Sequence, residues 1–170
     1  MRRVIAAVGV VAALVAVGPR AAAAETPSGW EPAPATPPYD WAAGTRCDFP
    51  THSQPLLDEV LQRVLDTYPD GKPKLVAYKG PLDIRVTNTA NGKSTDVDAG
   101  GSALVTYRPD GSQMWYAYGP VMTGWRDAGG NMPRGLYRLD GIYTLDIAAD
   151  GTKTLTLVHG TAEPLCPLIQ

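Results

Sequence analysis

The sequence predicts an all-β protein, an antiparallel meander of about seven or eight strands closed as a small barrel. Two observations support this fold class. Short runs rich in β-branched and aromatic residues alternate between apolar and polar positions, which is the period of a strand with one buried face. Four dipeptides of the hairpin-turn type separate the runs, and they are Asp70-Gly71, Asn91-Gly92, Asp110-Gly111 and Asp150-Gly151. A two-sheet β-sandwich is the alternative closure.

The clearest hairpin spans residues 80–101. Leu82, Ile84 and Val86 point one way along an extended chain, and the polar residues between them point the other way. Asn91-Gly92 tolerates the positive φ values of a tight hairpin turn. The same pattern predicts further strands in the remaining runs, which are 103–107, 114–118, 142–147 and 154–158.

Residues 55–68 allow two interpretations. Leucine and valine side chains recur there at helical spacing, which predicts one amphipathic helix. The turn sequence Pro69-Asp70-Gly71 and an apolar run at 75–78 follow, and this order is also typical of a hairpin between two strands. Periodicity alone favours the helix.

The first 24 residues have the layout of a secretory signal peptide. A basic start at Arg2 and Arg3 precedes a charge-free apolar run, 4–17, and small residues at 21–24 offer a cleavage site after Ala24. The run is shorter than the ~20 residues that span a bilayer, which disfavours the alternative, an uncleaved membrane anchor. We therefore expect a secreted, extracellular protein with no membrane span after cleavage.

Cleavage changes the charge of the chain. The whole sequence has 15 basic and 17 acidic residues, and loss of Arg2, Arg3 and Arg20 leaves 12 basic residues and a formal net charge of −5. A mildly acidic surface argues against nucleic acid and against an anionic membrane as partners.

The mature chain is predicted to consist of a linker (25–46) and a single β domain (47–170). Five prolines among small residues favour an extended, poorly ordered chain in the linker. Trp30, Tyr39 and Trp41 lie in it. We expect one or two of these rings to fold back over the edge of the domain, and docking onto a partner is the alternative.

The two cysteines, Cys47 and Cys166, lie at opposite ends of the predicted domain. In the oxidising compartment that export implies, such a pair is expected to form a disulfide, and two free thiols are the alternative. A bridge that closes about 120 residues contributes up to about 5 kcal/mol in the chain-entropy model. It would suit a barrel, whose first and last strands meet, and also a sandwich with adjacent ends.

Several short motifs lie at the ends and bends of the predicted strands. They are Cys47-Asp48-Phe49-Pro50, Gly80-Pro81-Leu82-Asp83-Ile84-Arg85-Val86-Thr87-Asn88 with Asn91-Gly92-Lys93-Ser94, Gly100-Gly101, Pro109-Asp110-Gly111-Ser112, Gly119-Pro120 and Cys166. Together they resemble a group of small secreted actinobacterial proteins of unknown function. The resemblance covers 47–170, is most specific at 80–94, and implies strands instead of a helix over 60–79. It implies no activity and no catalytic residue.

The sequence offers few groups for catalysis or metal binding. His52 and His159 are its only histidines, and no serine lies in a G-x-S-x-G motif. His159 shares the parity of Leu155, so we expect its side chain to point inward. An Asp96-x-Asp98-x-Gly100 stretch resembles a calcium loop, but Tyr107 occupies position twelve, where an EF-hand needs glutamate. We therefore expect no catalytic residue, no metal and no cofactor.

Aromatic and cationic residues near the longest predicted connection are the candidates for a ligand site. Flat rings beside a guanidinium group suit a sugar or an apolar ligand. The candidates are Trp115, Tyr116, Tyr118, Trp125, Arg126, Arg134 and His159. In the competing interpretation, alternate aromatic residues fill the interior and Trp125 caps its mouth.

The sequence favours a non-catalytic binding or cell-envelope-associated module, a monomer whose partner is a small ligand, a glycan or an envelope component. The alternative is a small-barrel enzyme acting on a small hydrophobic or glycan substrate, with acid–base chemistry inside the barrel. A cavity that exposes His159 or a buried carboxylate would favour the enzyme. A packed interior with a flat aromatic rim would favour the binding module.

Overall fold

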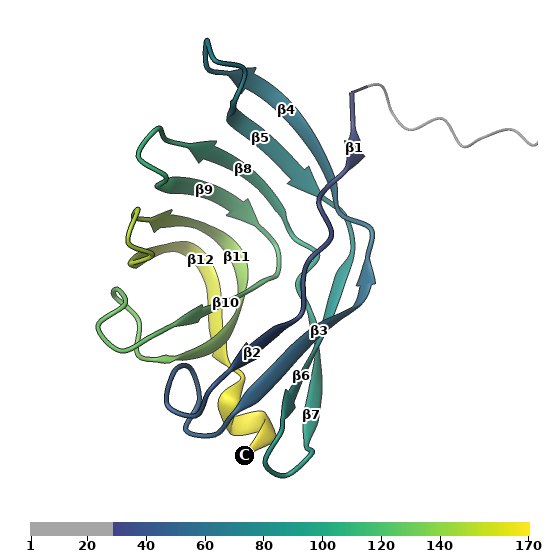
Figure 1. Ribbon diagram of the computed structural model, residues 1–170, viewed down its shortest axis with the longest axis vertical. Coiled ribbons are helices and arrows are strands. Elements are labelled where there is room, and N and C mark those ends of the chain that lie inside the picture. Colours follow the sequence, from purple (N-terminus) through teal and green to yellow (C-terminus); the bar gives the residue numbers. More distant parts are fainter. Residues whose placement is uncertain (1–28) are drawn as a thin grey trace, which may run out of the picture.

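The computed structural model describes residues 29–170, so the predicted signal peptide lies outside the described residues. Figure 1 shows a broad, strongly curved sheet beside a smaller one. The only helix in this range is the short 3₁₀ helix η1 (Cys166–Ile169), and no helix there is long and apolar enough to cross a membrane. The strands are β1 (Glu31–Pro32), β2 (Tyr39–Trp41), β3 (Thr51–Asp58), β4 (Leu61–Thr67), β5 (Pro73–Lys79), β6 (Leu82–Asn88), β7 (Ser94–Asp98), β8 (Ser102–Tyr107), β9 (Gln113–Tyr118), β10 (Val121–Trp125), β11 (Gly135–Ile147) and β12 (Lys153–Pro164). The all-β class predicted from the sequence is confirmed.

The strands form two antiparallel sheets. In the larger sheet the order is β1-β4-β5-β8-β9-β11-β10, with β12 also paired to β11, and in the smaller sheet it is β2-β3-β6-β7. Within residues 29–170 the larger sheet does not close, because β1 pairs only with β4 and β12 pairs only with β11. The expected barrel is therefore not found, and the arrangement fits the alternative, a two-sheet sandwich.

Glycines lie where the chain crosses between the sheets. Gly80 joins β5 of the larger sheet to β6 of the smaller sheet, and Gly101 precedes β8, where the chain returns to the larger sheet. Gly119 joins β9 to β10 within the larger sheet. A Cβ atom at Gly101 would lie 2.5 Å from the carbonyl oxygen of Pro120, so at this bend backbone packs directly against backbone. Glycine is typical of such corners, where strands turn from one sheet towards another.

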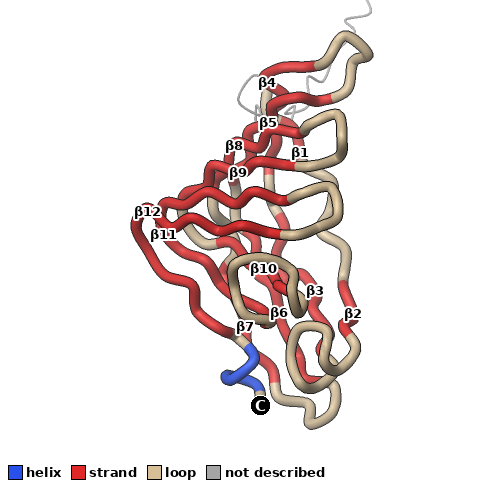
Figure 2. The backbone as a smooth tube through the Cα atoms, turned by 90° about the vertical axis from the view of Figure 1, so that its left-hand side faces the viewer, coloured by secondary structure: helices blue, strands red, loops and turns tan. Residues whose placement is uncertain are grey.

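The four predicted hairpin turns are all present. The glycine of each turn has a positive φ of 77° to 88°, as the turn type requires. In each turn the preceding Asp or Asn side chain accepts a hydrogen bond from the amide two residues later, and these bonds are Asp70–Lys72, Asn91–Lys93, Asp110–Ser112 and Asp150–Thr152. The hairpins β4–β5, β8–β9 and β11–β12 follow one another along one edge of the molecule (Figure 2).

The β6–β7 hairpin has the two faces that its alternation predicts. Ile84 and Val86 are buried on one face. On the other face Arg85 forms a two-point ion pair with Asp96 on the neighbouring strand, with both N···O distances at 2.7 Å. The buried face packs against the start of β11 and against η1, where it forms one of two apolar core clusters.

Residues 55–68 contain no helix, so the helix predicted from their periodicity is wrong. They belong to the end of β3 and to β4. The register of both strands shifts, at 55–57 and at 64–66, where β-bulges interrupt the pairing. A bulge adds a residue and breaks strict alternation, which leaves the apolar side chains at helix-like intervals. The strand interpretation of 60–79 is confirmed by β4 and β5.

The predicted linker is not a free segment over residues 29–46. Its short strands β1 and β2 pair with β4 and β3. Trp30 lies against Lys79, whose Nζ is 4.3 Å from the ring centre, and Tyr39 stacks on Trp41. Trp30 and Trp41 therefore fold back on the domain, in agreement with the expectation that one or two of the three rings do so, while Tyr39 is 53% exposed.

Cys47 and Cys166 form the predicted disulfide, with their Cα atoms 5.6 Å apart. Cys47 is buried in the apolar cluster that joins the smaller sheet, β11 and η1. Asn88 adds a second tie, because its buried side-chain amide donates a 3.0 Å hydrogen bond to the carbonyl oxygen of Ile169. The last residues of the chain are therefore held against the β6–β7 hairpin.

Candidate functional site

A cleft of about 670 Å³ lies between the two sheets. This volume is in the usual range for sites that hold a small molecule. Its walls come from β3 and β6 of the smaller sheet and from β8, β9 and β10 of the larger sheet. The apolar side chains that form most of the wall include Val60, Leu82, Ile84, Val121, Met122 and Leu136. The cleft therefore offers a mainly apolar interior to a ligand.

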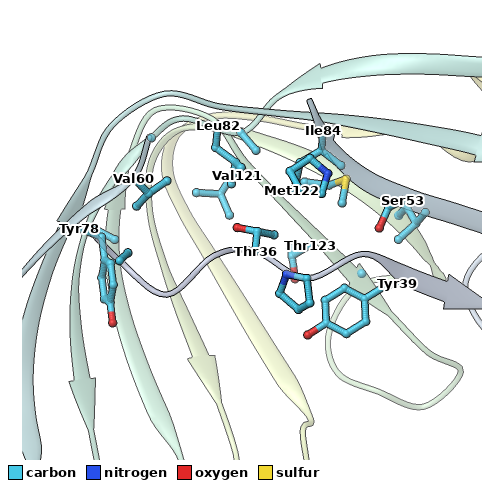
Figure 3. A pocket seen from close by; sticks show the side chains of 18 of the residues that line it. Thr36, Tyr39, Ser53, Val60, Tyr78, Leu82, Ile84, Val121, Met122 and Thr123 are labelled. Carbon is cyan, nitrogen blue, oxygen red and sulfur yellow. The ribbon is translucent and has the colours of Figure 1, made fainter. Parts of the chain in front are cut away.

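Residues 33–38, between β1 and β2, cross the cleft, and we call this segment the strap. In Figure 3 it passes over the cleft, with the side chain of Thr36 lying among those of Val121 and Thr123. Two backbone amides of the strap are anchored: that of Ala33 donates to the carbonyl of Val60, and that of Thr36 donates to a carboxylate oxygen of Asp58 at 2.7 Å. Three of its six residues are prolines, which have no amide to donate.

Lys153 lies at one end of the cleft. It is the first residue of β12 and faces inward with Leu155, two positions further along the strand. Its Nζ donates to the hydroxyl of Thr123 at 2.9 Å and to the carbonyl oxygen of Gly124 at 2.8 Å. Burial, together with the positive charge of Arg46, lowers the pKa of Lys153 to about 8.

Arg46 lies beside Lys153 at the same end. One of its terminal nitrogens donates to the carbonyl of Thr45, while its Nε is buried and has no hydrogen-bond partner. The side chain crosses the face of Gly124, where a Cβ atom would lie 2.8 Å from Cδ and 2.9 Å from Nε of Arg46. Burial also lowers the pKa of Arg46, helped by the charge of Arg126. Among residues 29–170, neither Arg46 nor Lys153 forms an ion pair with a carboxylate.

Two tyrosines line another part of the cleft. The hydroxyl groups of Tyr78 and Tyr107 are hydrogen-bonded to each other at 2.7 Å, and the hydroxyl of Tyr68 donates to the backbone carbonyl of Tyr107. Burial raises the pKa of Tyr107, so this group is neutral at physiological pH. Both Tyr78 and Tyr107 also line a second hollow of about 780 Å³ between the tips of the β4–β5 and β8–β9 hairpins. The tyrosine pair therefore separates the two spaces.

The structure places the four aromatic candidates in different environments. Trp115 lines the cleft. Trp125 is buried, and its indole Nε1 donates a hydrogen bond to the backbone carbonyl oxygen of Lys153. Tyr116 and Tyr118 lie on the opposite face of the larger sheet, 56% and 68% exposed, because alternate residues of β9 face opposite ways.

The three remaining candidates also lie outside the cleft lining. Arg126 is exposed and donates to the carbonyl of Asp150. Arg134 is paired with Asp48 at 2.6 Å and with Asp127 at 3.4 Å.

His159 does not point inward, so that expectation is wrong. A register shift in the β11–β12 pairing leaves Val158 without a partner, so Leu157 pairs with Tyr143 while His159 pairs with Ile142. This bulge turns His159 to the outer, exposed face of the sheet. Of the seven candidates, Trp115 lines the cleft and Trp125 supports its cationic end.

Sequence reasoning missed Arg46 and Lys153. A signal for Lys153 was present, because this lysine shares the parity of Leu155 and so belongs to the apolar face of its strand. Arg46 carries a weaker signal, since it precedes a cysteine that was expected to be bridged and buried. Neither signal shows that the two side chains meet, because 107 positions separate them in the chain.

The cleft is lined by apolar side chains together with hydroxyl, amide and cationic groups. Its lining contains no histidine, cysteine, aspartate or glutamate. Residues 29–170 also contain no group of three or more such side chains that could hold a metal ion. Imidazole, thiol and carboxylate groups are therefore not available in the lining as nucleophile or base, while the hydroxyl of Thr123 lies 2.9 Å from Nζ of Lys153. The arrangement can instead hold an apolar body, with two cations at one end and tyrosine hydroxyls elsewhere in the wall.

Comparison of the chain with models of protein families, with curated proteins and with solved structures found no match. The resemblance to small secreted actinobacterial proteins stays a prediction.

Proposed function

We propose that this protein is a secreted, non-catalytic binding protein that holds a small, mainly apolar molecule in the cleft between its two sheets. The observation that carries the proposal is the apolar, strapped cleft of about 670 Å³. Sites for small molecules are usually concave and mostly apolar, with a few polar groups that orient the ligand. The cleft is mainly apolar, and the polar groups in its wall include the cations of Arg46 and Lys153 and the hydroxyls of Tyr78 and Tyr107.

Secretion is supported by two features of the chain. The Cys47–Cys166 disulfide is the kind of bond that persists in an oxidising compartment. The layout of residues 1–24 is that of a signal peptide. Among the partner classes expected from the sequence, the cleft favours a small apolar ligand over a glycan, because its lining is mainly apolar.

The proposal is tested by binding of N-phenyl-1-naphthylamine, an uncharged fluorescent probe. We expect saturable binding of one probe molecule per chain. The variant Thr36→Trp places a large ring in the cleft from the strap and is expected to weaken binding at least about tenfold. Thr156→Trp, on the exposed face of β12, is the matched control and should bind like the wild type.

Two results would overturn the proposal: no saturable binding of the probe, or equal binding by the wild type and Thr36→Trp. Native mass spectrometry of the exported protein adds an independent measurement. It would show an intact disulfide and the mass of any ligand that co-purifies with the chain.

An enzyme is the second candidate, and one observation favours it. Lys153 has a pKa lowered to about 8, so part of its amine is uncharged near neutral pH and can react with a carbonyl compound. Incubation with decanal and borohydride, followed by peptide mapping, tests this role. Selective alkylation of Lys153 would support the enzyme. Alkylation spread over the exposed lysines would remove this argument for it.

A further inference from the structure

The two cations at one end of the cleft restrict the chemistry of the ligand. We infer that the cleft takes an amphiphile with one apolar chain and an anionic head group, a carboxylate or a phosphate, held by Arg46 and Lys153. This inference rests on the proposed binding function and adds the charge and the orientation of the ligand.

The two cations lack a counter-charge. Taking a charge out of water is costly unless the charge is paired, so cations that are partly buried normally have a carboxylate beside them. Within residues 29–170, Arg46 and Lys153 are both partly buried and have no such partner, and this partial burial lowers the pKa of both groups. An anion bound between them would supply the missing charge.

Hydrogen-bond donors that the protein leaves unused meet at this end of the cleft. The Nε of Arg46 is buried without a partner, and only one of its terminal nitrogens donates to the protein. Lys153 donates two hydrogen bonds, which leaves one of its three N–H groups for a ligand.

The side chains of Arg46 and Lys153 both start from backbone that is held in place by other contacts. Arg46 immediately precedes the bridged Cys47. The backbone of Lys153 is bonded on both sides, since its amide donates to Gly129 and its carbonyl accepts from Asn131 and from the indole of Trp125. Donors held in place before binding lose little freedom when an anion arrives.

The apolar part of the ligand would lie along the remaining wall. Met122 on β10 and Leu136 on β11 are apolar lining residues near Gly124, on the cationic side. Leu82 and Ile84 continue the apolar wall on β6. Figure 3 shows Leu82, Ile84, Val121 and Met122 directed into one common space. A head group at Arg46 and Lys153 with a chain along this wall uses both parts of the cleft.

The test compares ligands with one chain length and different head groups. Dodecanoate, dodecyl phosphate and dodecanol are each titrated against the wild type with bound N-phenyl-1-naphthylamine, at concentrations below those that form micelles, and displacement of the probe gives the affinity of each ligand. We expect dodecanoate or dodecyl phosphate to bind at least about tenfold more tightly than dodecanol. The better of the two anions identifies the head group.

Three variants locate the effect. Lys153→Met and Arg46→Met keep an apolar stem and should each bring the anion close to dodecanol in affinity, with dodecanol itself changed less than about twofold. Gly124→Ala keeps both charges but places a Cβ against Arg46, and it should also reduce the preference for the anion. Lys93→Met removes an exposed lysine of the β6–β7 hairpin as the matched control and should leave the preference unchanged.

The outcomes separate this inference from the function on which it rests. Equal binding of dodecanoate, dodecyl phosphate and dodecanol by the wild type would contradict the preference for an anionic head group. It would not contradict the proposed binding function. Failure of the probe and of all three ligands to bind overturns both. Since the decisive comparison uses the wild type, a variant that fails to fold does not affect it.

Discussion

Gly141 and Gly160 face each other across β11 and β12, and both have a positive φ, 126° and 130°. A Cβ atom on Gly141 would overlap the backbone oxygen of His159, and one on Gly160 would overlap that of Asp140. The two longest strands therefore bend together at a point where neither backbone has room for a side chain.

We expect Gly141→Ala and Gly160→Ala each to lower the free energy of unfolding by about 3 kcal/mol or more, because the conformation and the overlap both disfavour alanine. Chemical denaturation measures the effect. The control is Gly151→Ala, which also has a positive φ but meets no atom within 4 Å and should cost only about 1 kcal/mol. Similar losses in all three variants would show that the overlap contributes nothing.

Release of the strap is expected to speed ligand exchange. Asp58→Ala removes the carboxylate that accepts the amide of Thr36, so the strap keeps one fewer anchor. We expect probe dissociation, measured by stopped-flow fluorescence, to become faster on the order of tenfold. The neighbouring variant Glu59→Ala makes the same change of charge on an exposed side chain and serves as the control. Unchanged dissociation in Asp58→Ala would mean that the strap does not limit release.

Lys153→Met is expected to stabilise the ligand-free protein at pH 7. The pKa of Lys153 is lowered from 10.5 to about 8 in the folded state by burial and by Arg46. Between these values the unfolded chain binds more protons than the folded protein, so the wild type gains stability as pH rises through about 8. The other groups around Nζ, Thr123, Gly124 and Trp125, carry no charge.

The measurement is the thermal midpoint of wild type and variant at pH 7 and at pH 9, below the range in which tyrosines titrate. Each kcal/mol of added stability should raise the midpoint by about 2–4 °C in a chain of this size. The advantage of Lys153→Met should shrink at pH 9. An equal difference at both pH values would contradict a charged, buried Lys153.

Loss of the disulfide should affect stability and ligand preference together. We expect the double variant Cys47→Ser/Cys166→Ser to lose about 2–5 kcal/mol of stability. Because Arg46 adjoins Cys47, we also expect a smaller preference for dodecanoate over dodecanol. Measurement at a temperature where the variant is still folded separates the effects. An unchanged preference would show that Arg46 is held by its other contacts.

The sequence was sufficient for the local structure of much of the chain. Turn dipeptides such as Asn91-Gly92 act through their own backbone preferences, so they could be recognised without knowledge of the fold. The alternation of Ile84 and Val86 reports burial directly, because each strand residue faces one side only. The disulfide followed from the presence of two cysteines in a chain with a predicted signal peptide.

The sequence was insufficient where an irregularity changes the phase of a strand. The bulge at Val158 reverses the direction of His159, and bulges in β3 and β4 imitate a helical period. Such insertions depend on pairing with a neighbouring strand and leave no local mark. The cleft could not be predicted for a related reason: Arg46 and Lys153 come together only when the two sheets are in place.

The bridge between Cys47 and Cys166 encloses all four hairpin tips, since it spans 119 positions of the chain. A protease that cuts once at Asp70-Gly71, Asn91-Gly92, Asp110-Gly111 or Asp150-Gly151 would therefore produce two fragments that stay covalently joined. The sheets could reassemble from pieces that cannot diffuse apart. In the extracellular location proposed above, where peptidases are common, a molecule that has been cut once would in this way keep its cleft.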